Sequence, residues 1–362
     1  MKFCAVLRNH PEDRPGGAEY QSHLICEELA ARGFETHYVA HRASTERVDE
    51  SEGVMIHRCT GGGRSIIEKL RMIDADVYYF RLFPDLPLLY RARRTIDAMF
   101  TYNISRSVQC APLFTGGVRS DTNLIGSALE KVQYGTYRFL LKTPDLVFAQ
   151  TAEQQHMLEQ YHGLDAKVVG NGHPVPERAC SKTSPKVVLW LGNLKAVKRP
   201  QDFIRVVESI HNTDIRFWIV GRPVDSEVHK YVERRARKIP SLEYHGGCDI
   251  DECNAYFQQA SLFVHTGVAE GFPNTFIQSW LHEVPVISLD TDPDRVLEVK
   301  SIGYHSESID DAAVRVMELS DQDKKRARMG RAARSYAIEH HDIELVVDRL
   351  LTHLKIYFQS HT

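Results

Sequence analysis

Long apolar runs are missing from this chain, and their absence argues against a membrane-spanning protein. No run in the 362 residues approaches the roughly 20 residues that a transmembrane helix needs. The apolar stretch in the N-terminal sequence MKFCAVLRNH is too short for a signal peptide. We therefore expect a cytoplasmic protein.

Paired cysteines and a large net charge are also missing. The seven cysteines are odd in number and never spaced as Cys-x-x-Cys, so we expect reduced thiols, with neither a zinc site nor a disulfide framework. A net charge of −3 argues against a nucleic-acid-binding protein. Hydrophobic residues make up 43% of the chain and charged residues 26%, which is typical of a globular protein, and the length favours two domains.

Complete nucleotide-binding motifs are missing as well, but part of one is present. Gly16 and Gly17 lie between an expected strand at 2–7 and a helical pattern that leads to a second strand at 34–40. The pair lacks the rest of the dinucleotide fingerprint, yet its backbone N–H groups come close to whatever lies above the sheet. Glu19 either stabilises the helix dipole or contacts an acceptor.

The same alternation of strands and helices continues along the chain. A segment at 171–176 with two prolines and a glycine marks a domain boundary, and the pattern is helical from about residue 309 to the end. A helix with basic and aromatic residues is expected at about 127–142. Its charged face is either the solvent-exposed side of a core helix or a surface that rests on anionic lipid. Further strands are expected at 54–57, 76–80, 112–115, 146–149, 187–191, 216–220, 242–245, 262–265 and 286–289.

Three cations gather in the loop after the expected strand at 187–191. The loop, GNLKAVKR, opens with Gly192 and Asn193, carries Lys195, Lys198 and Arg199, and leads into a helix. A glycine turn, a helix N-terminus and three cations together suit a diphosphate, although a solvated basic loop is the alternative.

The richest stretch is 261–285, SLFVHTGVAEGFPNTFIQSWLHEVP. Glu270 lies in the turn where an apolar strand passes into a helix, at the positive end of the helix dipole. Asn274 and Gln278 are four residues apart, so they share the helix face that begins at this turn. The alternative is a capping acid followed by a solvated face. The residues expected to bind a donor here are Glu270, Gly271, Phe272, Asn274, Thr275 and Gln278.

This stretch resembles the family-four retaining glycosyltransferases (glycosyl transferases group 1), whose signature is Glu, seven residues, Glu. Glu270 matches the first acid, which in the family contacts the hydroxyls of the donor sugar. Gln278 replaces the second acid, which binds the ribose, so the chain offers a neutral and weaker hydrogen bond there. Lys198 matches the family's phosphate-binding lysine. Asn193 replaces the family's arginine, and Lys195 supplies a charge but no bidentate fork.

The resemblance implies an α/β protein with two Rossmann-like domains that face each other across a cleft, the GT-B fold. The turn at Gly16, Gly17 and Glu19 would face the cleft, and the loop containing Gly247 would hold the nucleotide base largely by its backbone. The expected parts are an acceptor domain at 1–172, a donor domain at 173–340, and a C-terminal helix at 341–362 that crosses back to the acceptor domain.

The implied activity is retaining, metal-independent transfer of a sugar from a nucleotide-diphosphate sugar, such as a UDP-sugar, to a hydroxyl acceptor. Glu270 and Lys198 would be the catalytic residues, and no protein nucleophile is identified. The family suggests a lipid-linked glycan of bacterial surface polysaccharide as acceptor, with a peripheral contact at the inner face of the plasma membrane through the N-terminal domain.

Neither a metal nor another cofactor is expected. The Asp-x-Asp pairs do not follow the strands of the first domain, where a metal-binding pair would have to lie. Two alternative functions remain. One is a nucleotide-sugar epimerase of the same fold, and the other is a catalytically weak binding or scaffold subunit, which Asn193 and Gln278 favour.

Overall fold

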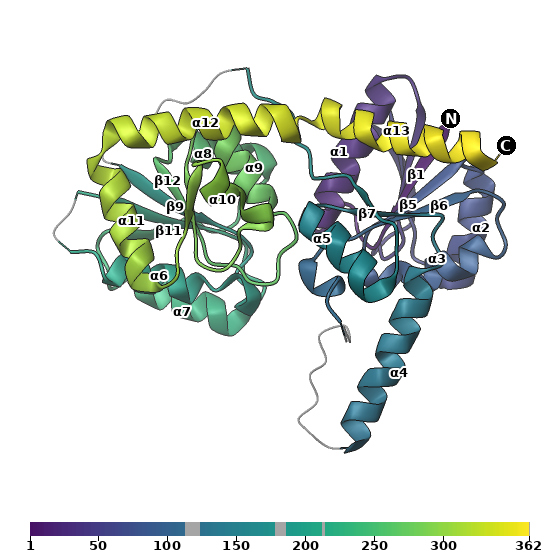
Figure 1. The fold of residues 1–362 in the computed structure, drawn as a ribbon, viewed down its shortest axis with the longest axis horizontal. Coiled ribbons are helices and arrows are strands. Elements are labelled where there is room, and N and C mark those ends of the chain that lie inside the picture. Colours follow the sequence, from purple (N-terminus) through teal and green to yellow (C-terminus); the bar gives the residue numbers. More distant parts are fainter. Residues whose placement is uncertain (113–123, 178–185, 212–213, 362) are drawn as a thin grey trace. The chain divides into compact units, whose positions relative to one another are not determined.

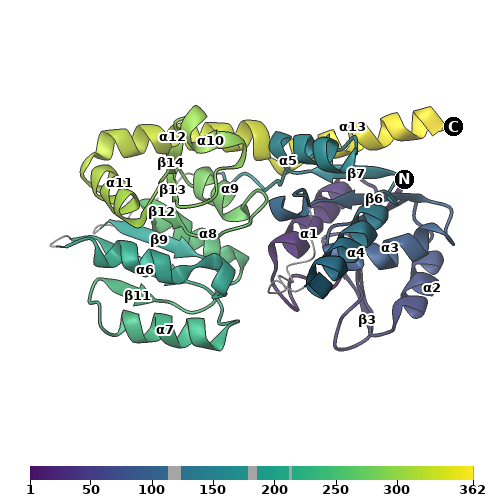
Figure 2. The same ribbon diagram turned by 60° about the horizontal axis from the view of Figure 1, so that its bottom comes forward.

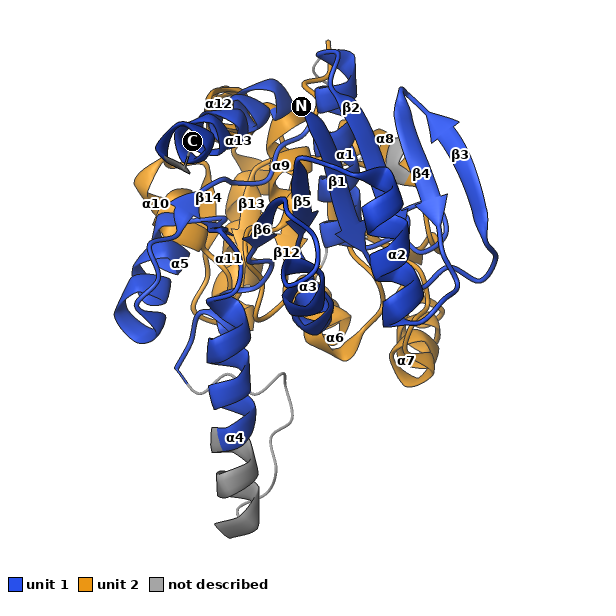
Figure 3. Ribbon diagram, turned by 90° about the vertical axis from the view of Figure 1, so that its right-hand side faces the viewer, with its two compact units in different colours: residues 1–173, 343–362 blue, residues 174–342 orange. Residues whose placement is uncertain are grey.

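The chain passes from one folding unit into a second and then returns to the first (Figure 1). The computed structural model describes residues 1–112, 124–177, 186–211 and 214–361. Unit 1 consists of Met1–His173 and Ile343–Thr362, and unit 2 consists of Pro174–Asp342 (Figure 3). In the part of the chain that is described, no helix is long and apolar enough to cross a membrane.

Unit 1 is a mostly parallel sheet with helices on both faces. Its strands are β1 Lys2–Leu7, β2 Glu35–Ala40, β3 Arg47–Ser51, β4 Val54–Arg58, β5 Val77–Phe80, β6 Met99–Asn103, β7 Leu146–Ala149 and β8 Lys167–Val168. Its helices are α1 Gly17–Ala31, α2 Gly63–Ile73, α3 Leu86–Arg93, α4 Leu124–Leu141, α5 Ala152–Met157 and α13 Ile343–His361, with the short helical turns η1 Phe83–Asp85, η2 Ser107–Gln109 and η3 Leu158–His162. The strand order is β3-β4-β2-β1-β5-β6-β7-β8, and only β3 is antiparallel to its neighbour.

Alternation along β1 explains why both faces of this sheet are covered. Phe3 and Leu7 belong to a core that includes residues of α1 and α13, whereas Cys4 and Val6 belong to a second core with α2 and α3. Successive side chains of a strand point to opposite faces, so a strand that is apolar throughout needs a helical layer on each side.

The last helix, α13, completes the first of these cores. Val346, Leu350 and Leu354 are buried in it, and α13 lies alongside α1 (Figures 1 and 2). Arg32, at the end of α1, donates to the backbone carbonyl of Glu344 at 2.8 Å. The predicted return of the C-terminal helix to the N-terminal domain is therefore confirmed.

Unit 2 is an entirely parallel sheet, again with two helical layers. Its strands are β9 Val187–Leu191, β10 Arg216–Val220, β11 Leu242–Tyr244, β12 Leu262–His265, β13 Val286–Ser288 and β14 Gly303–His305. Its helices are α6 Pro200–Glu208, α7 Ser226–Ala236, α8 Ile250–Gln259, α9 Asn274–Leu281, α10 Val296–Val299, α11 Ile309–Asp321 and α12 Asp323–His341, with the turns η4 Ala196–Lys198 and η5 Pro293–Arg295. The order is β11-β10-β9-β12-β13-β14. The connections therefore run outward in opposite directions from β9 and β12.

The expected strands agree with the structure except in the middle of unit 1. The sequence did not predict β6 Met99–Asn103, and it placed a strand at 112–115 instead. Pro112 lies in a turn, and the rest of that segment is outside the described residues. The short strands β3, β8 and β14 were also not predicted.

Candidate functional site

The carboxyl ends of β9 and β12 mark the place in unit 2 where a ligand is expected. These strands are neighbours, and the strand order reverses direction between them. In open parallel sheets, ligands bind outside the carboxyl ends of the strands at such a point. The loop 192–199 follows β9 and the loop 266–273 follows β12, so both predicted motifs arrive at the same position.

Hydrogen bonds fasten these two loops to each other. The indole N–H of Trp190 donates to the hydroxyl of Thr266 at 2.9 Å, and that hydroxyl donates to the carbonyls of Lys198 and Arg199 at 2.7 and 2.8 Å. The backbone N–H of Val268 donates to the carbonyl of Val197 at 3.0 Å. Trp190 and Thr266 were not predicted from the sequence, because neither has a motif spacing relative to the cations that it positions.

Lys198 and Glu270 form an ion pair at the centre of the site. The ammonium of Lys198 donates to Oε1 of Glu270, and the two side chains are 30% and 20% exposed. The two residues were predicted separately, one for the diphosphate and one for the sugar. The structure brings them together, with both side chains still accessible from solvent.

Gly267 lies between the side chains of Glu270 and His265. A Cβ at Gly267 would lie 3.0 Å from Oε1 of Glu270 and 3.0 Å from Nε2 of His265, so a larger residue would displace one of them. His265 is buried, and burial lowers its pKa to about 4. Its imidazole is therefore neutral near pH 7, whereas Lys198 places a positive charge beside Glu270.

The other two cations of the loop are Arg199 and Lys195. The guanidinium of Arg199 forms an ion pair with Asp202 in the first turn of α6, and Asp202 also accepts from Arg205 at 3.1 Å. Lys195 is exposed at the start of η4. Within the predicted cluster of three cations, Lys198 thus pairs with the predicted sugar-binding acid, whereas Arg199 pairs with Asp202.

The predicted polar row on α9 is only partly accessible. Asn274 is half-buried at the first position of α9, whereas Gln278 is 8% exposed and its amide donates to Oδ1 of Asn254 on α8 at 3.4 Å. The side chain of Phe272 is buried and packs against His341, with ring centroids 4.4 Å apart. Phe272 therefore offers a ligand its backbone and not its ring. Asn254 was not identified from the sequence.

Close backbone contact holds the neighbouring loops in place. A Cβ at Gly221, after β10, would lie 1.9 Å from the carbonyl oxygen of Gly192. A Cβ at Gly247, after β11, would lie 2.2 Å from Cγ of Arg222. Only glycine fits these two positions, so the loop predicted to hold a nucleotide base is packed tightly against its neighbour.

A disulfide in this region corrects the cysteine prediction. The structure joins Cys248 to Cys253, although the sequence analysis expected reduced thiols throughout. Asp249 between them is the N-cap of α8 and accepts from the N–H of Glu252 at 2.9 Å. The start of a helix brings residues five apart within bonding reach, which a search for Cys-x-x-Cys spacing overlooks. The disulfide ties the loop that contains Gly247, which was predicted to hold the nucleotide base, to the first turn of α8.

The glycine turn of unit 1 has the geometry of a helix start. Gly16 is the N-cap of α1 and Gly17 its first residue. A Cβ at Gly16 would lie 2.2 Å from Oε2 of Glu19, so this carboxylate folds back over the first turn. That placement is the one expected of an acid that stabilises the helix dipole.

Metal-ligating side chains do not gather in the part of the chain that the structure describes. No group of three or more His, Cys, Asp or Glu residues there is arranged to hold a metal ion.

A comparison with protein families finds a match within unit 2. Residues 185–321 match the family model described as glycosyl transferases group 1. The matched segment contains both loops of the candidate site. No curated protein sequence matches the chain.

Solved structures resemble the whole chain. Sucrose-phosphate synthase from Thermosynechococcus elongatus matches with a TM-score of 0.82 at 12% identity, over 99% of this chain and 100% of that one. Anabaena HepE in complex with UDP-glucose matches with a TM-score of 0.77 at 14% identity, over 98% and 99% of the two chains. A glycosyltransferase from Rickettsia africae matches with a TM-score of 0.71 at 13% identity, over 99% and 98%. The predicted two-domain GT-B fold is confirmed.

Proposed function

We propose that the chain, whose residues 185–321 match the model for glycosyl transferases group 1, transfers a sugar from a nucleotide-diphosphate sugar to a hydroxyl acceptor. The observation that carries the proposal is the contact of Lys198 with Glu270 where the strand order of unit 2 reverses. It joins a cation suited to a diphosphate with an acid suited to sugar hydroxyls. The solved complex of HepE with UDP-glucose makes a UDP-sugar the first donor to test.

The proposed chemistry is loss of the nucleoside diphosphate through an oxocarbenium-like transition state. Negative charge grows on the leaving oxygen as the bond to the anomeric carbon breaks. Lys198 and the N-termini of α6 and α9 would stabilise that charge. Glu270 and Asn274 would hold the sugar hydroxyls, and the N–H groups around Gly271 would add donors. We propose retention of configuration on the family resemblance, with no nucleophilic residue assigned.

The decisive experiment combines turnover with binding. Purified protein is incubated with UDP-, GDP- and ADP-sugars, and release of the nucleoside diphosphate is followed with and without candidate acceptors. Glu270→Gln should lower turnover by about 10- to 100-fold, the effect of one charged hydrogen bond, and should leave binding of the free nucleoside diphosphate nearly unchanged. Wild-type turnover in this variant would contradict the assignment of Glu270.

The same assay separates the two alternative functions. An epimerase would convert the donor sugar without releasing the nucleoside diphosphate. A scaffold subunit would bind the nucleotide sugar without turnover. Binding would then be seen as added stability, because a ligand at 100 times its dissociation constant raises the free energy of unfolding by about 2.7 kcal/mol.

We also propose that no metal ion takes part. The positive charge of Lys198 and the helix N-termini at the site supply the stabilisation that a divalent ion would otherwise give. Turnover should therefore persist in excess chelator. Loss of activity that manganese or magnesium restores would contradict this part of the proposal.

The proposed acceptor is a lipid-linked glycan of bacterial surface polysaccharide, reached from unit 1 at the membrane surface. Helix α4 supports this because Phe139 is 58% exposed and Arg138 lies beside it. Tyr90 of α3 contacts the ring of Phe139 and the guanidinium of Arg94, which extends the basic and aromatic surface. Phe139→Ser together with Arg138→Gln should reduce sedimentation with anionic vesicles and leave donor turnover unchanged.

A further inference from the structure

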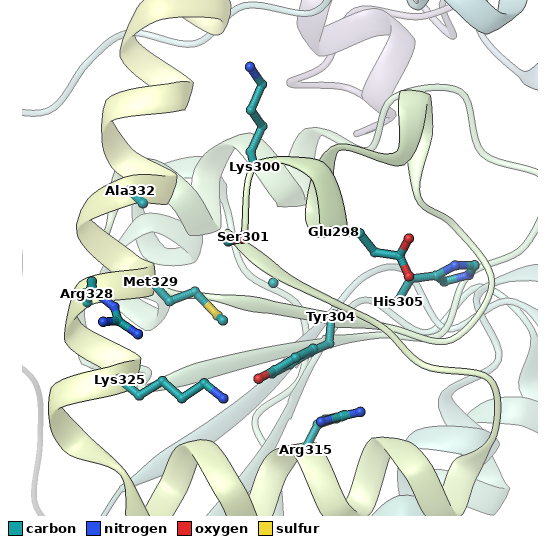
Figure 4. A pocket seen from close by; sticks show the side chains of 11 residues that line it. Glu298, Lys300, Ser301, Tyr304, His305, Arg315, Lys325, Arg328, Met329 and Ala332 are labelled. Carbon is teal, nitrogen blue, oxygen red and sulfur yellow. The ribbon is translucent and has the colours of Figure 1, made fainter.

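A cavity of about 620 Å³ lies in unit 2 beside the edge strand β14 (Figure 4). Its walls come from β14, from α10 and the segment that joins it to β14, and from α11 and α12. In the strand order, β13 separates β14 from β12, and none of the residues of the candidate donor site lines this cavity. It is therefore a separate feature of the unit.

One face of α12 supplies much of the wall. Lys325, Arg328, Met329 and Ala332 are spaced so that they share one side of a helix, and all four line the cavity. In Figure 4 the side chains of Lys325 and Arg328 extend from the side of α12 that faces Tyr304 of β14.

Tyr304 of β14 forms the opposite wall. The guanidinium carbon of Arg315 lies 4.6 Å from the centroid of its ring, and the ammonium of Lys325 lies 5.5 Å from it. Glu318 of α11 binds both cations, at 3.2 Å from Arg315 and 2.5 Å from Lys325. Because Glu318 does not line the cavity, it fixes the two cations from behind.

The walls carry an excess of positive charge. Four cationic side chains, Lys300, Arg315, Lys325 and Arg328, line the cavity with one carboxylate, Glu298, whose Oε2 accepts from Arg295 at 3.0 Å. The carboxylates of Glu318 and Asp311 pair with Arg315 and Lys325 from outside the lining, and the cationic side chains still outnumber the acidic ones. We propose that this cavity binds a small phosphorylated anion, with Arg328, Lys325 and Arg315 on the phosphate and Tyr304 beside the organic part. Lys300 points away from Tyr304 in Figure 4 and contributes charge at the rim.

The chemistry of the walls selects this class of ligand. Arginine forks bind phosphate through two parallel hydrogen bonds, and lysine adds a compact charge. An aromatic ring offers a flat surface to a sugar or a base. The volume lies within the range of small-molecule sites, roughly 300–1,000 Å³, and is far larger than one phosphate ion requires. A sugar phosphate or a nucleotide fits better than inorganic phosphate.

Calorimetric titration of the whole protein tests the proposal with glucose 6-phosphate and with inorganic pyrophosphate. Arg328→Gln should weaken binding of the sugar phosphate by about 10-fold, and Arg328→Glu by more, because one charged hydrogen bond is lost or reversed. Arg331→Gln is the matched control, since Arg331 is exposed on the same helix and does not line the cavity. It should change affinity by less than about 2-fold. Arg328 is exposed, so its variants should fold, and thermal melting checks this.

The variant Lys198→Ala separates this cavity from the proposed donor site. Binding that survives Lys198→Ala and is lost in Arg328→Glu supports the cavity, whether or not the chain proves to be a glycosyltransferase. Tighter binding of glucose 6-phosphate than of pyrophosphate would show recognition of the sugar, and equal affinity would show recognition of phosphate alone. Binding lost with Lys198 but kept in the Arg328 variants would overturn the proposal, as would equal losses in the Arg328 and Arg331 variants or no binding at millimolar concentration.

Discussion

At the scale of single residues, a donor phosphate that reaches Lys198 has to compete with Glu270. The two side chains are partly buried, so their attraction is stronger than that of a fully exposed pair. In the proposed complex, a bound donor would offer each of them a substitute partner, the diphosphate for the ammonium and the sugar hydroxyls for the carboxylate. The ion pair therefore keeps both groups at the site until a donor exchanges its contacts.

Alanine substitutions in the cation loop should separate the three cations. Lys198→Ala should lower turnover more than donor affinity, by about 2–4 kcal/mol in the barrier, because charge on the leaving oxygen develops in the transition state. Arg199→Ala should act mainly on stability, because Arg199 is bound to Asp202. Lys195→Ala should have the smallest effect on both. Turnover and the donor dissociation constant of the three variants are the measurements, and a mildest effect at Lys198 would refute its role.

A double variant tests whether Lys198 and Glu270 act together. If they act as a unit, the loss of turnover in Lys198→Ala with Glu270→Gln should be smaller than the sum of the two separate losses in barrier energy. Additive losses would show that each residue acts on its own part of the donor.

The sequence contained Lys198 and Glu270 as separate candidates but not their contact. They are 72 residues apart, and they meet only because β9 pairs with β12 and not with a later strand. Trp190, Thr266 and Asn254 were missed for the same reason, since their roles depend on neighbours that the strand order brings close. Motif spacing predicts a local turn well, whereas contacts across a sheet require the topology.

At the scale of elements, α13 is predicted to be essential for the stability of unit 1. Leu350 is fully buried between α13 and the sheet, so Leu350→Ala should lower the free energy of unfolding by about 2–5 kcal/mol. Ile356 lies on the same helix but is 57% exposed, so Ile356→Ala should cost much less. Denaturant unfolding followed by circular dichroism compares the two variants. Equal losses would show that α13 does not complete this core.

The elements that the sequence failed to predict share a physical cause. Strand β6, with the sequence MFTYN, is buried along its whole length although it contains Thr101 and Asn103. A buried strand that carries polar residues shows neither alternation nor an apolar run, so its pattern resembles a loop. The helix start at Asp249 likewise placed Cys248 within reach of Cys253, which composition alone did not suggest.

At the scale of the whole molecule, buried histidines are divided between the two units. Burial lowers the pKa of His10 to about 3 and that of His57 to about 4, and both belong to unit 1. His265, in unit 2, has a pKa of about 4 for the same reason. All three imidazoles are therefore neutral in the folded protein near pH 7, and both units should lose stability in acid.

Acid should destabilise the protein in a defined pH window. The pKa of an unfolded histidine is about 6.5, so between pH 6.5 and 4 the unfolded chain binds more protons than the folded one and stability falls as the pH falls. The loss is at most about 2 kcal/mol for each histidine by pH 5. Asp292 acts in the opposite direction, because burial raises its pKa and protonation then favours the folded state. Burial lowers the pKa of His162, His245 and His353 as well, so the histidines outweigh Asp292 and the net effect is a loss.

Thermal midpoints measured between pH 7.5 and 5 test this expectation. They should stay level above about pH 6.5 and decline below it. His265→Gln removes one titrating group from unit 2 and should flatten the decline of the transition that belongs to that unit. The control is His211→Gln, because His211 is exposed and its loss should leave the slope unchanged. A decline of wild-type steepness in His265→Gln would mean that this imidazole accepts a proton without unfolding, and its position beside Gly267 would then be open to water.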